Sequence, residues 1–277
     1  MANITAAEVN KLRKQTGAGM MDCKKALVEA DGDYEKAIDI LRKKGQKVAG
    51  SRADRDANEG VVLAKVSDDK KSAAIIMLNC ETDFVGKNQE MIDFTRQLLD
   101  LGLDKGCKST EELLAADMNG RTVQNSVTDM IGKTGEKLDL AKFEIINGDI
   151  AFAYIHPGNR VASVAVFNKS GVAEIESAGK DVVMQIAAMA PVALNSDSVP
   201  EDVKQREIEI GMDQARQEGK PEAMLEKIAM GKLNKFFKES TLLNQDFIKD
   251  SKKTVQQMLA DYDKDLTVVD FKRYALA

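Results

Sequence analysis

The sequence contains no tryptophan, a single histidine and only 5% aromatic residues. Proteins that bind single-stranded nucleic acid by base stacking use exposed aromatic rings. The scarcity of aromatic residues therefore argues against this mode of binding. A His-based catalytic triad or a zinc site would have to include His156. The sequence has no phosphate-binding loop of the Gly-x4-Gly-Lys-Ser/Thr type. These absences argue against an enzyme, and we expect no cofactor, no metal and no bound nucleotide.

Cysteine is also scarce, and the three cysteines, Cys23, Cys80 and Cys107, lie far apart. An odd number of widely spaced cysteines is typical of unpaired thiols in a reducing compartment. No apolar run approaches the ~20 residues that a membrane span needs, and the N-terminal residues lack the apolar core of a signal peptide. We therefore expect a cytoplasmic protein that does not enter the membrane.

The overall composition, 43% hydrophobic and 31% charged residues over a length of 277, is typical of a soluble globular protein with a sizeable core. The net charge of −5 does not indicate a general nucleic-acid-binding protein. Residues 1–55, however, contain 12 Lys and Arg against 8 Asp and Glu, a local charge of +4. This basic part leaves open one alternative function, an adaptor linked to RNA or the ribosome.

Residues 1–54 are predicted to form a domain of three short helices. Thr5 and Glu8 have the spacing of a capping box, in which each side chain satisfies a free backbone N–H at the start of the first helix. The apolar positions over residues 20–30 recur at helical spacing, and Asp33 can cap a third helix. Three helices in about fifty residues make a bundle of marginal stability.

Two segments are predicted to lie outside the globular parts. Residues 45–60 are small and polar with no apolar period, which is typical of a linker. Residues 198–240 contain two charge-rich helical patterns separated by Gly219 and Pro221. Their thin apolar stripes predict an inserted antiparallel helical hairpin of the coiled-coil type.

Between these segments the chain contains an internal repeat. Two strands joined by a polar turn and followed by a helix occur twice, 88 to 89 residues apart, with strands at 60–66, 73–79, 148–155 and 161–168. A further strand is expected at 266–274. The repeat predicts an α+β core of two related subdomains with antiparallel hairpins, over residues 55–145 and 146–277.

The corner after the second strand has the sequence Thr82-Asp83-Phe84-Val85, and the next helix is predicted to begin at Gln89. A Phe at such a corner commonly folds back into the core, and an Asp commonly caps the following helix. The alternative is that the corner is exposed and carries the functional site. A cysteine hydrolase using the neighbouring Cys80 is a poor hypothesis, because nearby carboxylates raise the pKa of a thiol.

The corner sequence resembles the signature of the bacterial elongation factor Ts family, the nucleotide-exchange factors of elongation factor Tu. Residues 16–27, Thr-Gly-Ala-Gly-Met-Met-Asp-Cys-Lys-Lys-Ala-Leu, are similar almost letter for letter to the opening of that family. Residues 131–136 resemble its Ile-Gly-Glu-Asn segment, with Lys133 and Thr134 in place of Glu and Asn. The resemblance implies that the N-terminal domain is of the ubiquitin-associated type and that it docks on the G domain of the partner.

The resemblance also implies the site residues. Mg²⁺ would be displaced from the partner, elongation factor Tu, by Thr82, Asp83, Phe84 and Val85. The residues implied to bind the partner are Met20, Met21, Lys24, Arg52, Ile131, Gly132 and His156. The function implied is nucleotide exchange without covalent chemistry, without direct nucleic-acid binding, and with a homodimer left open.

The single histidine precedes a Pro-Gly pair, in the order His156-Pro157-Gly158-Asn159. Pro-Gly favours a type II turn in which Gly158 has a positive φ, so His156 is expected at the exposed start of the turn. It would either contact the partner or be a surface histidine without a role.

Overall fold

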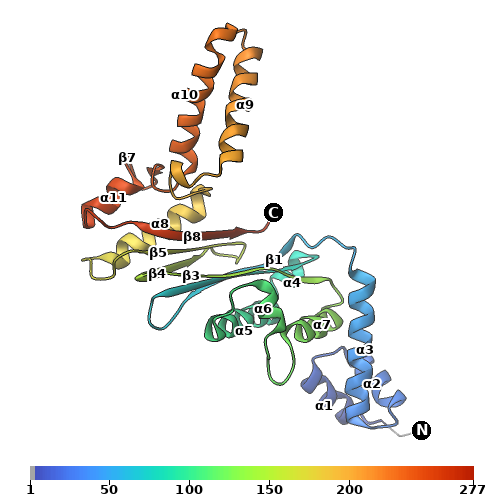
Figure 1. Ribbon diagram of the computed structural model, residues 1–277. Helices are drawn as coiled ribbons and strands as arrows, with labels where there is room; N and C mark the ends of the chain where they lie inside the picture. Colours follow the sequence, from blue (N-terminus) through green and yellow to red (C-terminus); the bar gives the residue numbers. More distant parts are fainter. Residues whose placement is uncertain (1–3) are drawn as a thin grey trace.

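A computed structural model describes residues 4–277 of the chain. A small helical module at the N-terminal end is followed by a central body of two stacked β-sheets, from which a helical hairpin protrudes (Figure 1). The predicted α+β fold, with N-terminal helices and antiparallel sheets, is therefore confirmed.

The N-terminal module consists of three helices, as predicted, which are α1 (Ala6–Thr16), α2 (Met20–Glu29) and α3 (Tyr34–Arg52). The capping box is present, since the Glu8 N–H donates to Thr5 Oγ1 and the Thr5 N–H donates to the Glu8 carboxylate. The small core of the module comprises Val9, Leu12, Cys23, Ala26, Leu27, Ala30 and Ala37.

The predicted linker over residues 45–60 is wrong in its first half, because α3 continues to Arg52 and only residues 53–58 separate it from the first strand. With two Gly, one Val and one Ser, residues 45–52 have low intrinsic helix propensity, and we attribute their helical form to packing of α3 on α7 (Val123–Thr134). Gly45 and Gly132 meet at the crossing, where a Cβ on Gly132 would lie 2.7 Å from the Cα of Gly45. This close crossing attaches the module to the body.

Each of the two main sheets has three antiparallel strands. The first has the order β1-β2-β3 and comprises β1 (Glu59–Val66), β2 (Ser72–Cys80) and β3 (Leu138–Asn147). The second has the order β4-β5-β8 and comprises β4 (Ile150–Ile155), β5 (Val161–Phe167) and β8 (Val268–Ala275). The predicted hairpins β1–β2 and β4–β5 and the predicted last strand are thus confirmed.

β3 has no counterpart among the predicted strands, and the predicted boundary at residues 145 and 146 falls inside it. It pairs with β2 just as β8 pairs with β5, so each sheet receives its third strand after its helices. Leu138, Leu140 and Phe143 of β3 are buried against the helices of the first sheet. The repeat in the sequence therefore extends over three strands in each unit.

The inner faces of the two sheets pack against each other, and helices cover their outer faces (Figure 1). Ile75 of β2 and Val164 of β5 lie in this core between the sheets. Strands buried on both faces are apolar throughout, which explains the continuous apolar runs of β2 and β5. The helices on the first sheet are α4 (Asp83–Gly86), α5 (Gln89–Lys105), α6 (Thr110–Ala115) and α7, and those on the second are α8 (Ile175–Met189) and α11 (Val255–Tyr262).

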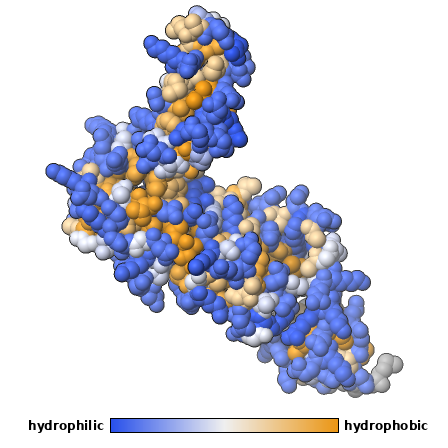
Figure 2. All heavy atoms as spheres, viewed as in Figure 1, coloured by the Kyte–Doolittle hydropathy of each residue, from blue (hydrophilic) through white to orange (hydrophobic). Residues whose placement is uncertain are grey.

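The predicted hairpin is formed by α9 (Glu201–Gln217) and α10 (Glu222–Ser240), with the short helix η1 (Ser196–Ser198) before it and the strands β6 (Asp246–Phe247) and β7 (Asp250–Thr254) after it. Figure 2 shows apolar residues along the hairpin between hydrophilic outer surfaces. The two helices meet at Gly211 and Ala215 of α9, which are buried against apolar residues of α10. Ile210, the neighbour of Gly211, is 42% exposed and lies outside this contact. Among the helices of residues 4–277, none is long and apolar enough to cross a membrane.

The Gly45–Gly132 crossing can be tested by adding one methyl group. Because the new Cβ of Gly132→Ala would meet backbone atoms of Gly45, we expect this variant to lower the free energy of unfolding by about 1–3 kcal/mol. Gly231→Ala, in the interior of α10 with nothing within 4 Å, is the matched control, and better helix propensity should make it neutral or stabilising. Thermal unfolding measures both, and equal shifts would contradict the close crossing.

Candidate functional site

The corner after β2 is a single turn of helix. α4 begins directly after Thr82, whose hydroxyl accepts a hydrogen bond from the Val85 N–H at 3.5 Å as the N-cap. The cap is therefore Thr82, not Asp83. At the other end of α4, Gly86 lies against β1, where an added Cβ would be 2.9 Å from the carbonyl oxygen of Gly60. Only a residue without a side chain permits this contact.

Phe84 is 84% exposed, the most exposed large hydrophobic side chain in the described part of the chain. The possibility that it folds back into the core is therefore wrong. Val85, the next residue, packs against the core of the first sheet instead, so the single turn of α4 directs Phe84 outward. An exposed aromatic ring on a well-ordered turn is typical of a surface that binds another protein.

Asp83 is partly exposed beside Phe84 and forms an ion pair with Lys87, whose ammonium donates to Asp83 Oδ2 at 2.6 Å. This hydrogen bond holds the pKa of Asp83 below its usual range, so the carboxylate is charged at neutral pH. Both side chains face solvent, and ion pairs screened by water in this way contribute little to stability. The carboxylate can therefore exchange Lys87 for another donor at small cost.

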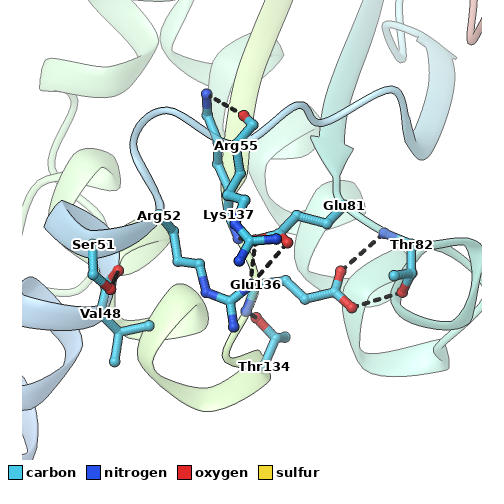
Figure 3. Close-up of polar contacts among 9 residues, drawn as sticks. All are labelled: Val48, Ser51, Arg52, Arg55, Glu81, Thr82, Thr134, Glu136 and Lys137. Carbon is cyan, nitrogen blue, oxygen red and sulfur yellow. Dashed lines mark hydrogen bonds and ion pairs between the residues drawn. The ribbon is translucent and has the colours of Figure 1, made fainter.

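Two glutamates hold the backbone that leads into the corner (Figure 3). The Glu136 carboxylate accepts hydrogen bonds from the Thr82 N–H at 3.1 Å and from the Thr82 hydroxyl at 2.6 Å. Glu81 accepts from the Arg52 guanidinium at 2.9 Å and from the Lys137 N–H at 2.7 Å. The end of α3, the corner and the turn between α7 and β3 are thus joined in one network.

Three of the residues expected to bind the partner, Arg52, Ile131 and Gly132, have structural contacts within the chain. Arg52 is used in the ion pair with Glu81, whose side chain is only 12% exposed. Ile131 is 6% exposed and belongs to the core of the first sheet, and Gly132 lies at the crossing with Gly45. Ile131 therefore packs in the core and Gly132 against α3, and a direct contact of either residue with the partner stays a prediction.

Glu136 was not among the predicted site residues. A Gly-Glu pair like that of the Ile-Gly-Glu-Asn segment is found at Gly135 and Glu136, three residues after the expected positions 132 and 133. This later register brings the Glu to the corner, where it contacts Thr82. The Gly135-Glu136 pair in the sequence could therefore have identified Glu136 as a candidate site residue.

Met20, Met21 and Lys24 lie together on the first turns of α2, and all three are exposed. Met20 is 51% and Met21 is 62% exposed, so this turn presents two long apolar side chains beside a positive charge. Flexible methionine side chains adapt to irregular surfaces, which suits them to protein contacts.

His156 lies where the sequence predicts, at the exposed start of the turn between β4 and β5. The turn is type II, since the Asn159 N–H donates to the His156 carbonyl at 3.0 Å and Gly158 has a φ of 92°. The His156 ring is 3.0 Å from the hydroxyl of Tyr154, measured at Nδ1.

The histidine turn and the corner are neighbours. The Val62 N–H of β1 donates to the Asn159 carbonyl at 2.8 Å, and Arg160 forms an ion pair with Glu59. A small cavity of about 20 Å³ between them is lined from the corner by Asp83 and Lys87 and from the turn by Gly158 and Arg160. Two sequence motifs about seventy residues apart therefore form one surface.

Cys80 cannot serve as a nucleophile at this site. Its side chain is fully buried and donates to the Thr82 carbonyl at 3.1 Å. Burial, together with the nearby Glu136 carboxylate, raises the pKa of the Cys80 thiol to about 12, so the reactive thiolate is not formed near neutral pH. Within residues 4–277, no cluster of His, Cys, Asp and Glu is arranged to hold a metal ion.

An outward-facing aromatic residue, a partly exposed acid and a second apolar cluster on an attached module are typical of a protein that binds another macromolecule. Comparison with known proteins agrees with this class. The family model for elongation factor Ts matches residues 81–277. The elongation factor Ts of Christiangramia forsetii is 51% identical and that of Cytophaga hutchinsonii is 50% identical, each over the full length of both chains. The one from Porphyromonas gingivalis is 49% identical over 99% of this chain and 98% of its own. The chain belongs to the elongation factor Ts family.

The exposure of Phe84 leads to a prediction about stability. Because its ring makes few contacts, we expect Phe84→Ala to change the free energy of unfolding by less than about 0.5 kcal/mol. Phe143→Ala is the matched control in the core of the same sheet, where the ring is 1% exposed, and it should cost about 3–5 kcal/mol. Thermal unfolding compares the two, and a large loss for Phe84→Ala would show that the ring is buried.

Proposed function

We propose that this protein is a guanine-nucleotide exchange factor of translation elongation that binds elongation factor Tu in its GDP form. Its membership of the elongation factor Ts family supports this proposal. The observation that carries it is the outward position of Phe84 on a corner held by Glu136 and Glu81. Such a factor carries out no covalent reaction. It binds the nucleotide-free partner more tightly than the loaded one, and by linkage it weakens nucleotide binding by the same factor.

The corner supplies the contacts that differ between the two states. A GTPase holds its nucleotide through a phosphate-binding loop and a Mg²⁺ ion. Phe84 enters the partner beside the metal site, where its burial contributes about 1.5–3 kcal/mol. Each 1.4 kcal/mol of this kind lowers nucleotide affinity about tenfold. Asp83, already charged, exchanges Lys87 for donor groups near the metal, so that Mg²⁺ and then GDP leave and GTP can bind.

The remaining exposed site residues provide docking contacts. Met20, Met21 and Lys24 bind the nucleotide-binding domain of the partner, and His156 binds a neighbouring domain. The alternative of an RNA-linked adaptor rests on the basic module, whose local charge is partly compensated within the module. Several of its cations are already paired with acids of the same module, which are Lys36 with Asp33, Arg42 with Asp39 and Lys44 with Asp22.

The proposal is tested by stopped-flow release of a fluorescent GDP from elongation factor Tu. At saturating protein concentration, we expect Phe84→Ala to slow release about ten- to hundredfold, the factor that corresponds to the lost burial of the ring. Phe84→Leu, which retains most of the apolar bulk, should release GDP at an intermediate rate. If the parent protein does not accelerate release, or Phe84→Ala equals the parent, the proposed mechanism is wrong.

His156→Ala tests the second contact. The side chain is exposed, so we expect unchanged thermal stability and a loss of about 1 kcal/mol in partner binding, or about fivefold in Kd. Calorimetric titration at a fixed pH measures this. Tyr154→Phe, which removes only the hydroxyl near Nδ1, is the control for an indirect effect through ring orientation. An affinity equal to that of the parent would show that His156 has no role in binding.

A further inference from the structure

We propose that Glu136 is a positioning residue, whose two hydrogen bonds to Thr82 fix the direction in which Phe84 and Asp83 face the partner. This inference rests on the proposed function. It assigns a role to a residue that touches neither the nucleotide nor, in our proposal, the partner.

The position of Glu136 is itself well defined. It follows Gly135, which ends α7 in the left-handed region with a φ of 74°, and it precedes the first residues of β3. The Glu136 N–H donates to Thr134 Oγ1 at 3.3 Å, which ties the turn back to the last residue of α7. Since α7 is packed on the first sheet, the carboxylate is presented from a fixed support.

The contact with Thr82 uses both carboxylate oxygens. Oε2 accepts from the Thr82 N–H and Oε1 accepts from the Thr82 hydroxyl, so the backbone and the side chain of this one residue are both held. Hydrogen bonds to a charged acceptor are stronger than those between neutral groups. The same hydroxyl oxygen is the cap of α4, since it accepts from the Val85 N–H. Glu136 therefore orients the group that starts the helix.

α4 depends on such anchors because it is so short. A single turn fixes several backbone dihedral angles for little hydrogen bonding, so it is not stable by itself. Its carboxyl end is held by the contact of Gly86 with Gly60 and by the packing of Val85 against the core. Its amino end is held by Glu136 through Thr82. The Phe84 ring is 84% exposed and has no core packing to direct it, so its direction follows that of the backbone.

Three substitutions at Glu136 distinguish the effect of side-chain length from the effect of charge. Glu136→Asp keeps the charge but shortens the side chain, and Glu136→Ala removes both hydrogen bonds. Glu136→Gln keeps the length and one carbonyl oxygen for the Thr82 N–H, so it should retain part of the function. At saturating protein, we expect GDP release from elongation factor Tu to fall about tenfold for Ala and Asp, and less for Gln.

Glu144→Ala is the matched control. Glu144 is another half-buried glutamate of the same region, in β3, and it also accepts from a hydroxyl, that of Tyr274, and from Lys272 at 2.9 Å. It lies away from the corner, so its loss should affect stability without lowering the release rate at saturation. A purely structural role for Glu136 predicts equal effects of the two Ala variants on stability and on release.

A second readout does not depend on exchange activity. Hydrogen exchange of the free protein should show faster exchange of the amides of residues 82–86 in Glu136→Ala and unchanged exchange there in Glu144→Ala. If Phe84→Ala slows release while Glu136→Ala leaves both release and amide exchange unchanged, the positioning role is overturned and the proposed function stands. If Phe84→Ala has no effect on release while the amides respond to Glu136→Ala, the proposed function fails and the anchoring of the corner stands.

Discussion

The burial of β2 on both of its faces is the constraint on which the rest of the structure depends. One face packs on the helices of the first sheet and the other on the second sheet, so the end of the strand at Cys80 has a fixed place in the body. Glu81 and Thr82 follow immediately and are bound to Arg52 and Glu136. Phe84 can therefore be almost fully exposed and still be held in one direction, which lowers the entropy lost when it binds.

The network at the end of β2 also connects the corner that carries Phe84 with the N-terminal module that carries Met20 and Met21. α3 carries the module with Met20 and Met21, crosses α7 at Gly45, and ends at Arg52 in the network beneath the corner. A partner that docks on the module thus meets the corner in a defined position. In the proposed function, the docking contacts of the module and the contacts of the corner would therefore act together on the same partner.

Much of the fold is predictable from local patterns, whereas the site depends on contacts that local patterns do not contain. Capping residues and apolar periods located the three helices, both hairpins and the α9–α10 insertion. The corner sequence allowed either direction for Phe84, because only the packing of Val85 and Gly86 decides it. The Thr82–Glu136 contact joins residues 54 positions apart, beyond the reach of any local rule. Ile131 is a different case, since its spacing from Val127 and Val123 is that of a buried helix face and indicated the core.

The central claim is that Phe84 enters the nucleotide-binding domain of elongation factor Tu beside its metal site. Photo-cross-linking tests this claim most directly. Benzoylphenylalanine replaces Phe84, and the complex with the nucleotide-free partner is irradiated. Mass spectrometry then identifies the cross-linked peptides. We predict cross-links to peptides that surround the bound Mg²⁺ and nucleotide, with a yield that falls when excess GDP and Mg²⁺ are added. Cross-links confined to other parts of the partner, or a yield that GDP and Mg²⁺ do not change, would contradict the claim.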